Sequence, residues 1–232
     1  MKTSARIALF ATTALLGGLS GTAQAQNDNT IRGGIYLIQY DARATDISGP
    51  FVPTAQPLNL SVDNVQTLYF AYVRRLSPSF DLELAAGWPP KTSTVGKGPT
   101  NVGSVPYAGQ EVATSRWFAP TLLLNYKFLD ASSRVRPYAG LGVNFTHFFD
   151  NTSTAAGNAV NGGPTSISLS DSFGWAATLG VSYRVQERWS LYGSYSVSQI
   201  KSDMSANTSG AIRRTTIDFR PSAVVLSAGY SF

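Results

Sequence analysis

The sequence has no cysteine, a single histidine and only two methionines in 232 residues. Without cysteine, disulfide frameworks, thiolate metal sites and cysteine nucleophiles are excluded, and a zinc site or a hydrolytic triad would have to use His147 alone. Charged side chains are also scarce: their 13% is about half the share found in soluble globular domains. With 43% apolar residues, the chain is not of the charge-rich type that stays disordered.

Long apolar runs are missing beyond the N-terminus, which excludes a helical membrane protein. The first residues carry Lys2 and Arg6, an uncharged stretch from Ile7 to Leu19, and then Ala23-Gln24-Ala25. This order predicts a cleaved secretory signal over residues 1–25, because the apolar stretch is too short for a spanning anchor. The mature chain, residues 26–232, is therefore expected outside the cytoplasm as one domain. It has no cluster of Lys and Arg with interleaved aromatics, so nucleic-acid binding is not expected.

Alternation of apolar with small or polar residues is abundant and indicates β-strands. The last segment shows it most clearly: Val224, Leu226, Ala228, Tyr230 and Phe232 share one face, and small residues share the other. The pattern recurs in eight segments, which are residues 31–40, 66–76, 80–88, 117–128, 135–145, 173–184, 189–197 and 223–232.

The spacers between these segments have two lengths. Long stretches rich in Gly, Ser, Asn and Pro (41–63, 89–113, 150–171 and 202–213) alternate with short ones (77–79, 129–134 and 186–188). This order is typical of an up-and-down antiparallel barrel with long extracellular loops and short periplasmic turns. A soluble sandwich or barrel also alternates, so a second argument is needed to separate the two.

The size of an eight-stranded barrel supplies that argument. Its interior is only just wide enough for side chains, so the small and polar face must point inward and the bulky apolar face outward, which requires lipid. Charge should then be absent from the middle of the outward face, and the outward arginines Arg74, Arg116 and Arg220 all fall near strand ends. The sequence thus predicts an all-β, eight-stranded transmembrane barrel in the outer membrane of a Gram-negative cell.

Short motifs spread over the mature chain resemble the OmpW family of outer-membrane proteins. The family pattern RPYxGxGxNY…FFD is similar to Arg136-Pro137-Tyr138-Ala139-Gly140-Leu141-Gly142-Val143-Asn144-Phe145 with Phe148-Phe149-Asp150. Its DSWG, SAGYRF, PPTL and GVELLAA motifs resemble Asp171-Ser172-Phe173-Gly174, Ser227-Ala228-Gly229-Tyr230-Ser231-Phe232, Ala119-Pro120-Thr121-Leu122 and Asp81-Leu82-Glu83-Leu84-Ala85-Ala86.

The resemblance implies an eight-stranded outer-membrane barrel for passive uptake of small hydrophobic compounds. In that family, a ligand enters an apolar passage from outside and leaves sideways into the membrane. Tyr230 and the C-terminal Phe232 also resemble the signal that the barrel-assembly machinery reads. The expected partners are therefore outer-membrane lipid, a small hydrophobic ligand and that machinery.

The odd or even position of a residue along its strand, which we call its parity, predicts whether its side chain points into the barrel and so how such a passage is built. It places Arg32, Asp81, Glu83, Lys127, Arg136 and Arg184 inside, near the periplasmic end. Because buried ions need partners, we expect a charge-paired floor that blocks an apolar ligand. A lateral exit above this floor is expected at Pro120 and Pro137, which each remove a hydrogen-bond donor; bulges or rim positions explain these prolines equally well.

The lining of the passage departs from the family pattern. Ala85 and Ser196 stand where the resemblance implies a leucine and a tryptophan at a constriction, and Ser222 stands where a Trp is expected. Residues that parity places along the interior path are Tyr69, Trp117, Leu123, Tyr138 and Tyr192. The smaller residues at the constriction widen or wet it and leave the ligand class open.

Other functions have less support in the sequence. An outer-membrane enzyme is not expected, because His147 shares its face with Phe145 and Phe149 and so points toward lipid at the outer rim. No spacing of His, Asp and Glu fits a metal site, and no cofactor is expected. The main alternative is a structural, adhesive or receptor barrel without a passage, whose polar loops bind a partner.

Overall fold

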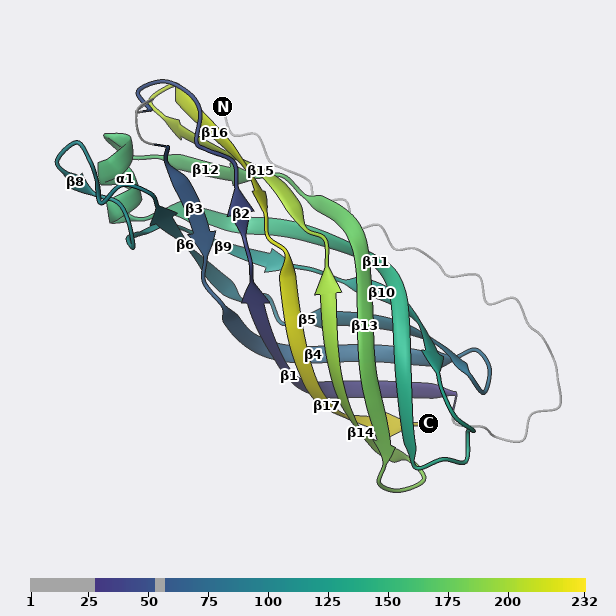
Figure 1. Ribbon diagram of the computed structural model, residues 1–232. Coiled ribbons are helices and arrows are strands. Elements are labelled where there is room, and N and C mark those ends of the chain that lie inside the picture. The colour runs from purple at the N-terminus through teal and green to yellow at the C-terminus, as the bar shows by residue number, and fades with distance from the viewer. Residues whose placement is uncertain (1–27, 53–56) are drawn as a thin grey trace, which may run out of the picture.

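The computed structural model describes residues 28–52 and 57–232, so the expected signal at residues 1–25 lies outside the described residues. Eight antiparallel strands form a closed barrel (Figure 1), which confirms the predicted fold. They are β1 (Asn29–Tyr40), β4 (Val65–Arg75), β5 (Phe80–Gly87), β10 (Thr121–Lys127), β11 (Val135–Ser153), β13 (Ser172–Arg184), β14 (Trp189–Ser198) and β17 (Pro221–Ser231). Each pairs with its sequence neighbour in this series, and β1 pairs with β17 to close the ring.

The first and last barrel strands meet at the end of the molecule that carries the short turns. Thr30 is in register with Ser231, and Phe232 donates its backbone N–H to the Asn29 carbonyl at 2.8 Å. In a barrel with an even number of strands, the start of the first strand and the end of the last strand lie on the same side of the membrane. In outer-membrane barrels this is the periplasmic side, where the short turns lie.

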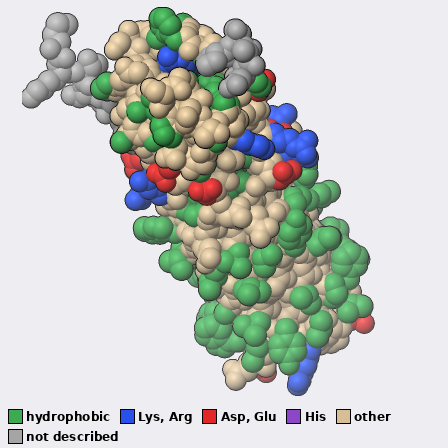
Figure 2. Space-filling view, turned by 60° about the vertical axis from the view of Figure 1, so that its left-hand side comes forward, with side chains coloured by type: hydrophobic (Ala, Val, Ile, Leu, Met, Phe, Trp, Pro, Cys, Tyr) green, Lys and Arg blue, Asp and Glu red, His purple; other side chains and the backbone are tan. Residues whose placement is uncertain are grey.

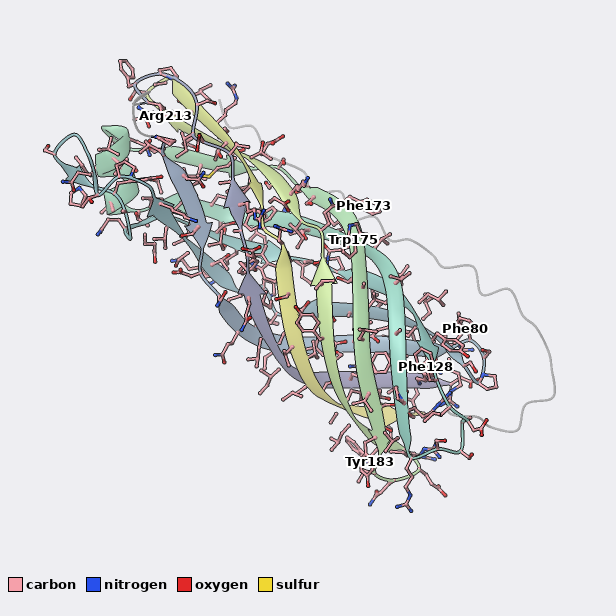
Figure 3. The ribbon with its side chains drawn as sticks, viewed as in Figure 1. Phe80, Phe128, Phe173, Trp175, Tyr183 and Arg213 are labelled. Atoms are coloured by element: carbon pink, nitrogen blue, oxygen red, sulfur yellow. The ribbon has the colours of Figure 1, made fainter. Side chains whose placement is uncertain are left out.

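The outside of the barrel is a continuous apolar band. Large apolar side chains point outward at alternate positions on every strand and are half or more exposed; examples are Ile31, Ile35, Leu68, Leu84, Leu141, Phe173, Leu179, Leu191 and Leu226. Figure 2 shows this band below a belt of charged residues. Aromatic side chains mark its two edges, with Phe80, Phe128 and Tyr183 near the short turns and Phe173 and Trp175 toward the long end (Figure 3). Such a surface is stable only in lipid.

The segments between the barrel strands at the outer end, predicted as long loops, contain ordered secondary structure. The strands continue beyond the barrel as two smaller sheets, and a short hairpin and one helix cover the outer end. One sheet joins β3 (Asn59–Val62), β6 (Lys91–Lys97) and β9 (Glu111–Phe118) to the end of β11, and the other joins β2 (Arg43–Ala44), β12 (Ser166–Leu169), β15 (Lys201–Thr208) and β16 (Ala211–Asp218). The hairpin is β7 (Asn101–Val102) with β8 (Val105–Pro106).

The helix α1 (Ala155–Asn161) has well-defined ends. The Thr154 side chain accepts a hydrogen bond from the Gly157 N–H at 3.0 Å, and Gly162 ends the helix with φ 80°. In the described residues, no helix is long and apolar enough to cross a membrane.

The segment predicted as one strand over residues 117–128 is in fact two strands. β9 ends at Phe118 and β10 begins at Thr121, with Ala119 and Pro120 between them. Both strands pair with β11 in one register, and the Pro120 carbonyl accepts from the Phe145 N–H at 3.0 Å; on the other side the partner changes from β5 to β6, which belongs to the extension.

Candidate ligand passage

The interior is divided into levels that follow one another along each strand. We call them the outer pocket, the aromatic plug, the inner cavity and the floor. On β9 and β10, for example, Val112 lines the outer pocket, Trp117 lies in the apolar cluster below it and Leu123 lines the inner cavity. The remaining strands contribute in the same order.

The outer pocket lies among the two small sheets and α1, and has a volume of about 60 Å³. Its lining is mainly apolar and includes Ile47, Val52, Leu58, Leu60, Val112, Val160, Ile167 and Met204. The exceptions include Asn161, Arg213, Arg214 and Thr215, which gather on α1 and β16. The pocket can therefore take up an apolar group beside a polar, positively charged edge.

The aromatic plug separates this pocket from the barrel interior. It contains Phe148 of β11, Phe219 before β17, Tyr40 of β1 and Trp117 of β9. The Phe148 and Phe219 rings stack with centroids 5.2 Å apart, and Tyr40 meets Phe219 edge-on at 6.2 Å. The Trp117 Nε1 is buried without a hydrogen-bond partner in the described chain. Because these aromatic rings fill the space between the outer pocket and the barrel interior, they must shift for a molecule to pass.

The inner cavity lies within the barrel and has a volume of about 40 Å³. Small side chains from several strands leave this space open; among them are Ala85, Ala119, Ala176, Ser194, Ser196 and Ala223. Leu123 and Val225 supply apolar walls, and Tyr69 and Glu83 form the end nearest the floor. A leucine and a tryptophan in place of Ala85 and Ser196 would fill it.

The floor is centred on a buried ion pair. The Arg32 Nη1 lies 2.9 Å from the Glu83 Oε2, and the two side chains are 2% and 5% exposed. Glu83 also accepts hydrogen bonds from the Tyr69 hydroxyl at 2.5 Å and the Asn125 side chain at 2.7 Å. The Arg32 guanidinium contacts Ser227 through two of its nitrogens. A buried pair with its remaining polar atoms satisfied is favourable, and no apolar molecule can replace these bonds.

Aromatic rings complete the floor around Arg32. The Arg32 guanidinium carbon lies 4.2 Å from the centroid of the Tyr192 ring and 5.3 Å from that of Tyr69, a cation–π arrangement. The Tyr138 ring is buried beside Gly180, where a Cβ atom would come within 2.4 Å of it. Because Gly180 on the facing strand has no Cβ atom, there is room for the Tyr138 ring inside the barrel.

The other charged residues assigned to the floor fall into two groups. Lys127 pairs with Asp81, and both side chains are largely buried. Arg136 and Arg184 form no ion pair in the described residues; Arg136 donates to the Pro78 and Leu129 carbonyls, and Arg184 to the Ala131 and Ser133 carbonyls. The expectation that all six residues pair with one another is thus corrected: two arginines instead tie down the periplasmic turns, whose backbone carbonyls are closer than any carboxylate.

The residues that parity placed along the path all point inward, but at three different levels. Ala85, Leu123 and Ser196 line the inner cavity. Tyr69 reaches from that cavity to the floor, which Tyr138 and Tyr192 help to form, and Trp117 lies in the plug. Parity predicts which face of its strand a residue occupies, whereas its depth along the barrel depends on the register between neighbouring strands.

The two prolines expected at the exit do not lie together. Pro120 adjoins Thr121, which is in register with Asn144 on β11. Pro137 is seven residues from Asn144 on that strand, or about 23 Å away at the usual strand rise. It is exposed at the periplasmic end, next to the level of Lys127, whose register partner is Tyr138. We therefore no longer place Pro137 at an exit above the floor.

The barrel wall is interrupted beside Pro120. Register pairs between β5 and β10 end at Ala85 with Thr121, and pairing resumes at Lys91 with Arg116 between β6 and β9. Both Ala119 and Thr121 line the inner cavity. The cavity wall thus includes a segment in which the ladder is absent.

A second weak point lies between β14 and β17 and was not anticipated from the sequence. Pairing ends at Val197 with Ser222, and Arg220 adopts a φ of 43° just before Pro221. A crevice on the outside of the wall and the inner cavity share Val197, Ser198 and Pro221 as lining residues. Pairing resumes in the same register with Phe219 donating its N–H to the Ile200 carbonyl at 2.9 Å, so the ladder is interrupted only around Pro221, which has no N–H to donate.

The single histidine lies outside the passage. His147 is half exposed, contacts the Asp171 carboxylate at 2.8 Å through Nδ1, and stacks on Phe149. Among the described residues, no group of three His, Asp or Glu side chains could hold a metal ion.

The match to a family model decides the family. The model of the OmpW family matches residues 26–232. This chain belongs to the OmpW family. It is 30% identical over 226 residues to outer membrane protein W of Salmonella typhimurium, covering 97% of this chain and 98% of that one. It is 27% identical to outer membrane protein W of Vibrio cholerae, covering 94% and 96%.

Solved structures support the same assignment. The crystal structure of the outer membrane protein OprG from Pseudomonas aeruginosa superposes with a TM-score of 0.77 at 26% identity, covering 88% of this chain and 95% of that one. As an OmpW-family barrel, the protein resides in the outer membrane of a Gram-negative cell, embedded in lipid.

Proposed function

We propose that this OmpW-family barrel takes up small hydrophobic compounds passively, from the outer pocket through the plug to the inner cavity and then sideways into the membrane. The observation that carries the proposal is the contrast between the two ends of the inner cavity. Toward the outside lie aromatic rings and an apolar pocket; toward the periplasm lies the buried pair of Arg32 and Glu83. An apolar molecule can displace the aromatic rings without breaking an ion pair. It cannot replace the bonds between Arg32 and Glu83.

The lateral step uses the wall gap beside Pro120. Because no register pairs join the two strands between Ala85–Thr121 and Lys91–Arg116, they can part at less cost there than where every N–H is paired. The β14–β17 crevice is a second possible exit, favoured by the three lining residues that it shares with the inner cavity. The crevice is lined by Trp175 and Tyr195 together with Asp41, Asp218 and Arg220, so a hydrophobic compound would enter the membrane at the outer edge of the apolar band.

Uptake of an aromatic tracer into lipid vesicles tests this function. Vesicles with the pure protein should take up the tracer faster than protein-free vesicles and vesicles with an unrelated eight-stranded barrel. Equal rates would instead favour the alternative, a structural, adhesive or receptor barrel in which the outer sheets only bind a partner. A disulfide between cysteines at Ala85 and Thr121, the last register pair before the gap, should slow uptake if the gap beside Pro120 is the exit.

We also propose an assembly signal at Tyr230 and Phe232 and a cleaved export signal over residues 1–25. Phe232 is 49% exposed at the periplasmic rim, and the Tyr230 ring meets Trp189 edge-on at 5.2 Å. These two residues are accessible for a role as the signal read by the barrel-assembly machinery. Loss of outer-membrane insertion on deletion of Phe232 would support the assembly signal. Cleavage after Ala25 in the mature protein would support the export signal.

A further inference from the structure

Two arginines stand at the edge of the outer pocket without an acidic partner. Arg213 and Arg214 are neighbours on β16, and both line the pocket (Figure 3 labels Arg213 at this outer end). All 13 acidic residues of the chain lie in the described part, yet neither arginine is within ion-pair distance of any of them. On the pocket face of β16, where Arg213 and Thr215 lie, the pocket therefore combines an apolar interior with one positive charge and no negative one.

Arg213 is held in place by groups from two other elements. Its Nε donates to the Pro50 carbonyl at 3.1 Å, and its Nη1 donates to the Asn161 side chain of α1 at 2.9 Å. These bonds fix the guanidinium while leaving Nη2 without a partner in the described residues. A side chain that is already ordered loses little conformational entropy when it binds an anion.

Arg214 is exposed and makes no side-chain hydrogen bond in the described chain. Only its backbone is engaged, through paired hydrogen bonds with Ser48. Because successive side chains of a strand point to opposite faces, the Arg214 side chain lies on the outer face of β16 and, of the two, Arg213 alone directs its guanidinium to the pocket. A guanidinium presents several N–H donors in a geometry that matches a carboxylate.

We propose that the outer pocket binds amphiphiles with one anionic end, such as a fatty-acid carboxylate, with the alkyl chain in the pocket and the carboxylate on Arg213. The volume of about 60 Å³ has room for roughly four water-sized groups, which suits a short stretch of alkyl chain. This inference rests on the proposed uptake function and narrows its substrate class.

Binding of octanoate and of methyl octanoate tests the proposal, because the two differ mainly in charge. Each is titrated, as labelled ligand, into the full protein in phosphatidylcholine nanodiscs, with empty nanodiscs as the blank. Octanoate should bind the unaltered protein more tightly than its ester at neutral pH and low salt. Arg213→Gln should weaken octanoate about tenfold, the equivalent of one charge-assisted contact, and leave the ester unchanged, whereas Arg214→Gln, on the outer face of β16, should change the binding of neither.

Lys97→Gln is the matched control. Lys97 is exposed, belongs to the same outer region and does not line the outer pocket, so this variant should bind both ligands as the unaltered protein does. Arg213→Lys keeps the positive charge and should bind octanoate more tightly than Arg213→Gln does, which keeps the test valid if loss of the bonds to Pro50 and Asn161 disturbs the loop. Equal weakening of both ligands in Arg213→Gln would mean that Arg213 only holds the fold, and no weakening of octanoate would also overturn the proposal.

Uptake of a neutral aromatic tracer, measured on the same variants, separates this inference from the proposed function. If the tracer enters normally and octanoate binding does not depend on Arg213, the anionic substrate class is wrong and passive uptake stands. If the tracer does not enter even with the unaltered protein, passive uptake is wrong, whereas an arginine-dependent octanoate site would still support the binding site itself.

Discussion

The Arg32 guanidinium of β1 lies 2.9 Å from the Glu83 carboxylate of β5, across the interior of the barrel and almost without exposure. The two residues are 51 positions apart in the chain, and β4 lies between their strands in the sheet. Closure of the barrel brings them together. Their pairing seals the periplasmic end against apolar molecules and also makes that end sensitive to the loss of either charge.

Replacement of Arg32 by Met should destabilise the barrel by about 3–5 kcal/mol, because Glu83 would remain buried without its counter-ion. Urea unfolding in lipid vesicles, followed by tryptophan fluorescence, measures this loss. The control is Arg43→Met, which removes an exposed pair with Asp41 and should cost about 0–1 kcal/mol. Similar costs for the two variants would contradict the role given to the buried pair.

Filling the inner cavity should block uptake without unfolding the protein. Ser196→Trp places a large ring among the small residues of the cavity, and it should abolish most of the protein-dependent tracer uptake. Tyr195→Trp is the matched control, since Tyr195 is the adjacent residue of β14 and faces lipid with 52% exposure. Full uptake by Ser196→Trp, in a variant that still resists unfolding as the unaltered protein does, would count against passage through this cavity.

Two engineered disulfides should show which wall opens. Register partners in an antiparallel pair have Cα atoms about 4.5–5.5 Å apart, which suits a disulfide, and the chain has no other cysteine. Cysteines at Ala85 and Thr121 lock the ladder beside Pro120, and cysteines at Val197 and Ser222 lock the edge of the β14–β17 crevice.

We expect the oxidised Ala85–Thr121 variant to take up tracer slowly and to recover on reduction. If only the Val197–Ser222 variant shows this behaviour, the exit is at the crevice. A lateral exit at either position becomes untenable if both oxidised proteins take up tracer at the full rate.

The outer region should loosen at alkaline pH. Burial raises the pKa of Tyr107 to about 12, above its usual value of about 10, and its hydroxyl donates to the Asn59 carbonyl at 2.5 Å. Between these pH values the folded state keeps a proton that the unfolded state has lost, so this contribution to stability is complete below pH 10 and decreases as the pH rises toward 12.

Cleavage of the outer sheets by a protease active at alkaline pH provides the measurement. Cleavage of the unaltered protein should accelerate across this range. Tyr107→Phe should be somewhat easier to cleave at neutral pH, because the hydrogen bond to Asn59 is lost, and should show a smaller acceleration. An identical pH profile for the two proteins would show that Tyr107 does not control the alkaline loosening.

The sequence by itself determined the barrel. Alternation with a period of two gave the inward and outward faces of all eight strands, because successive side chains of a strand point to opposite sides whatever the strand pairs with. It also gave the inward orientation of Arg32, Glu83, Ala85 and Ser196, and the family motifs agreed with the fold. The outer region was missed because its short strands lie among Gly, Ser and Asn residues, although alternations such as Leu58, Leu60 and Val62 were a signal.

Only the tertiary structure decided depth and pairing. Parity could not show that Pro137 lies near the periplasmic end and Pro120 beside a wall gap, because depth depends on the register between strands. Nor could it show that Arg136 and Arg184 bind turn carbonyls while Arg32 pairs with Glu83, or that Arg213 lies at an apolar pocket. These contacts join residues far apart in the chain, and their energies depend on distances and burial that exist only once the barrel has closed.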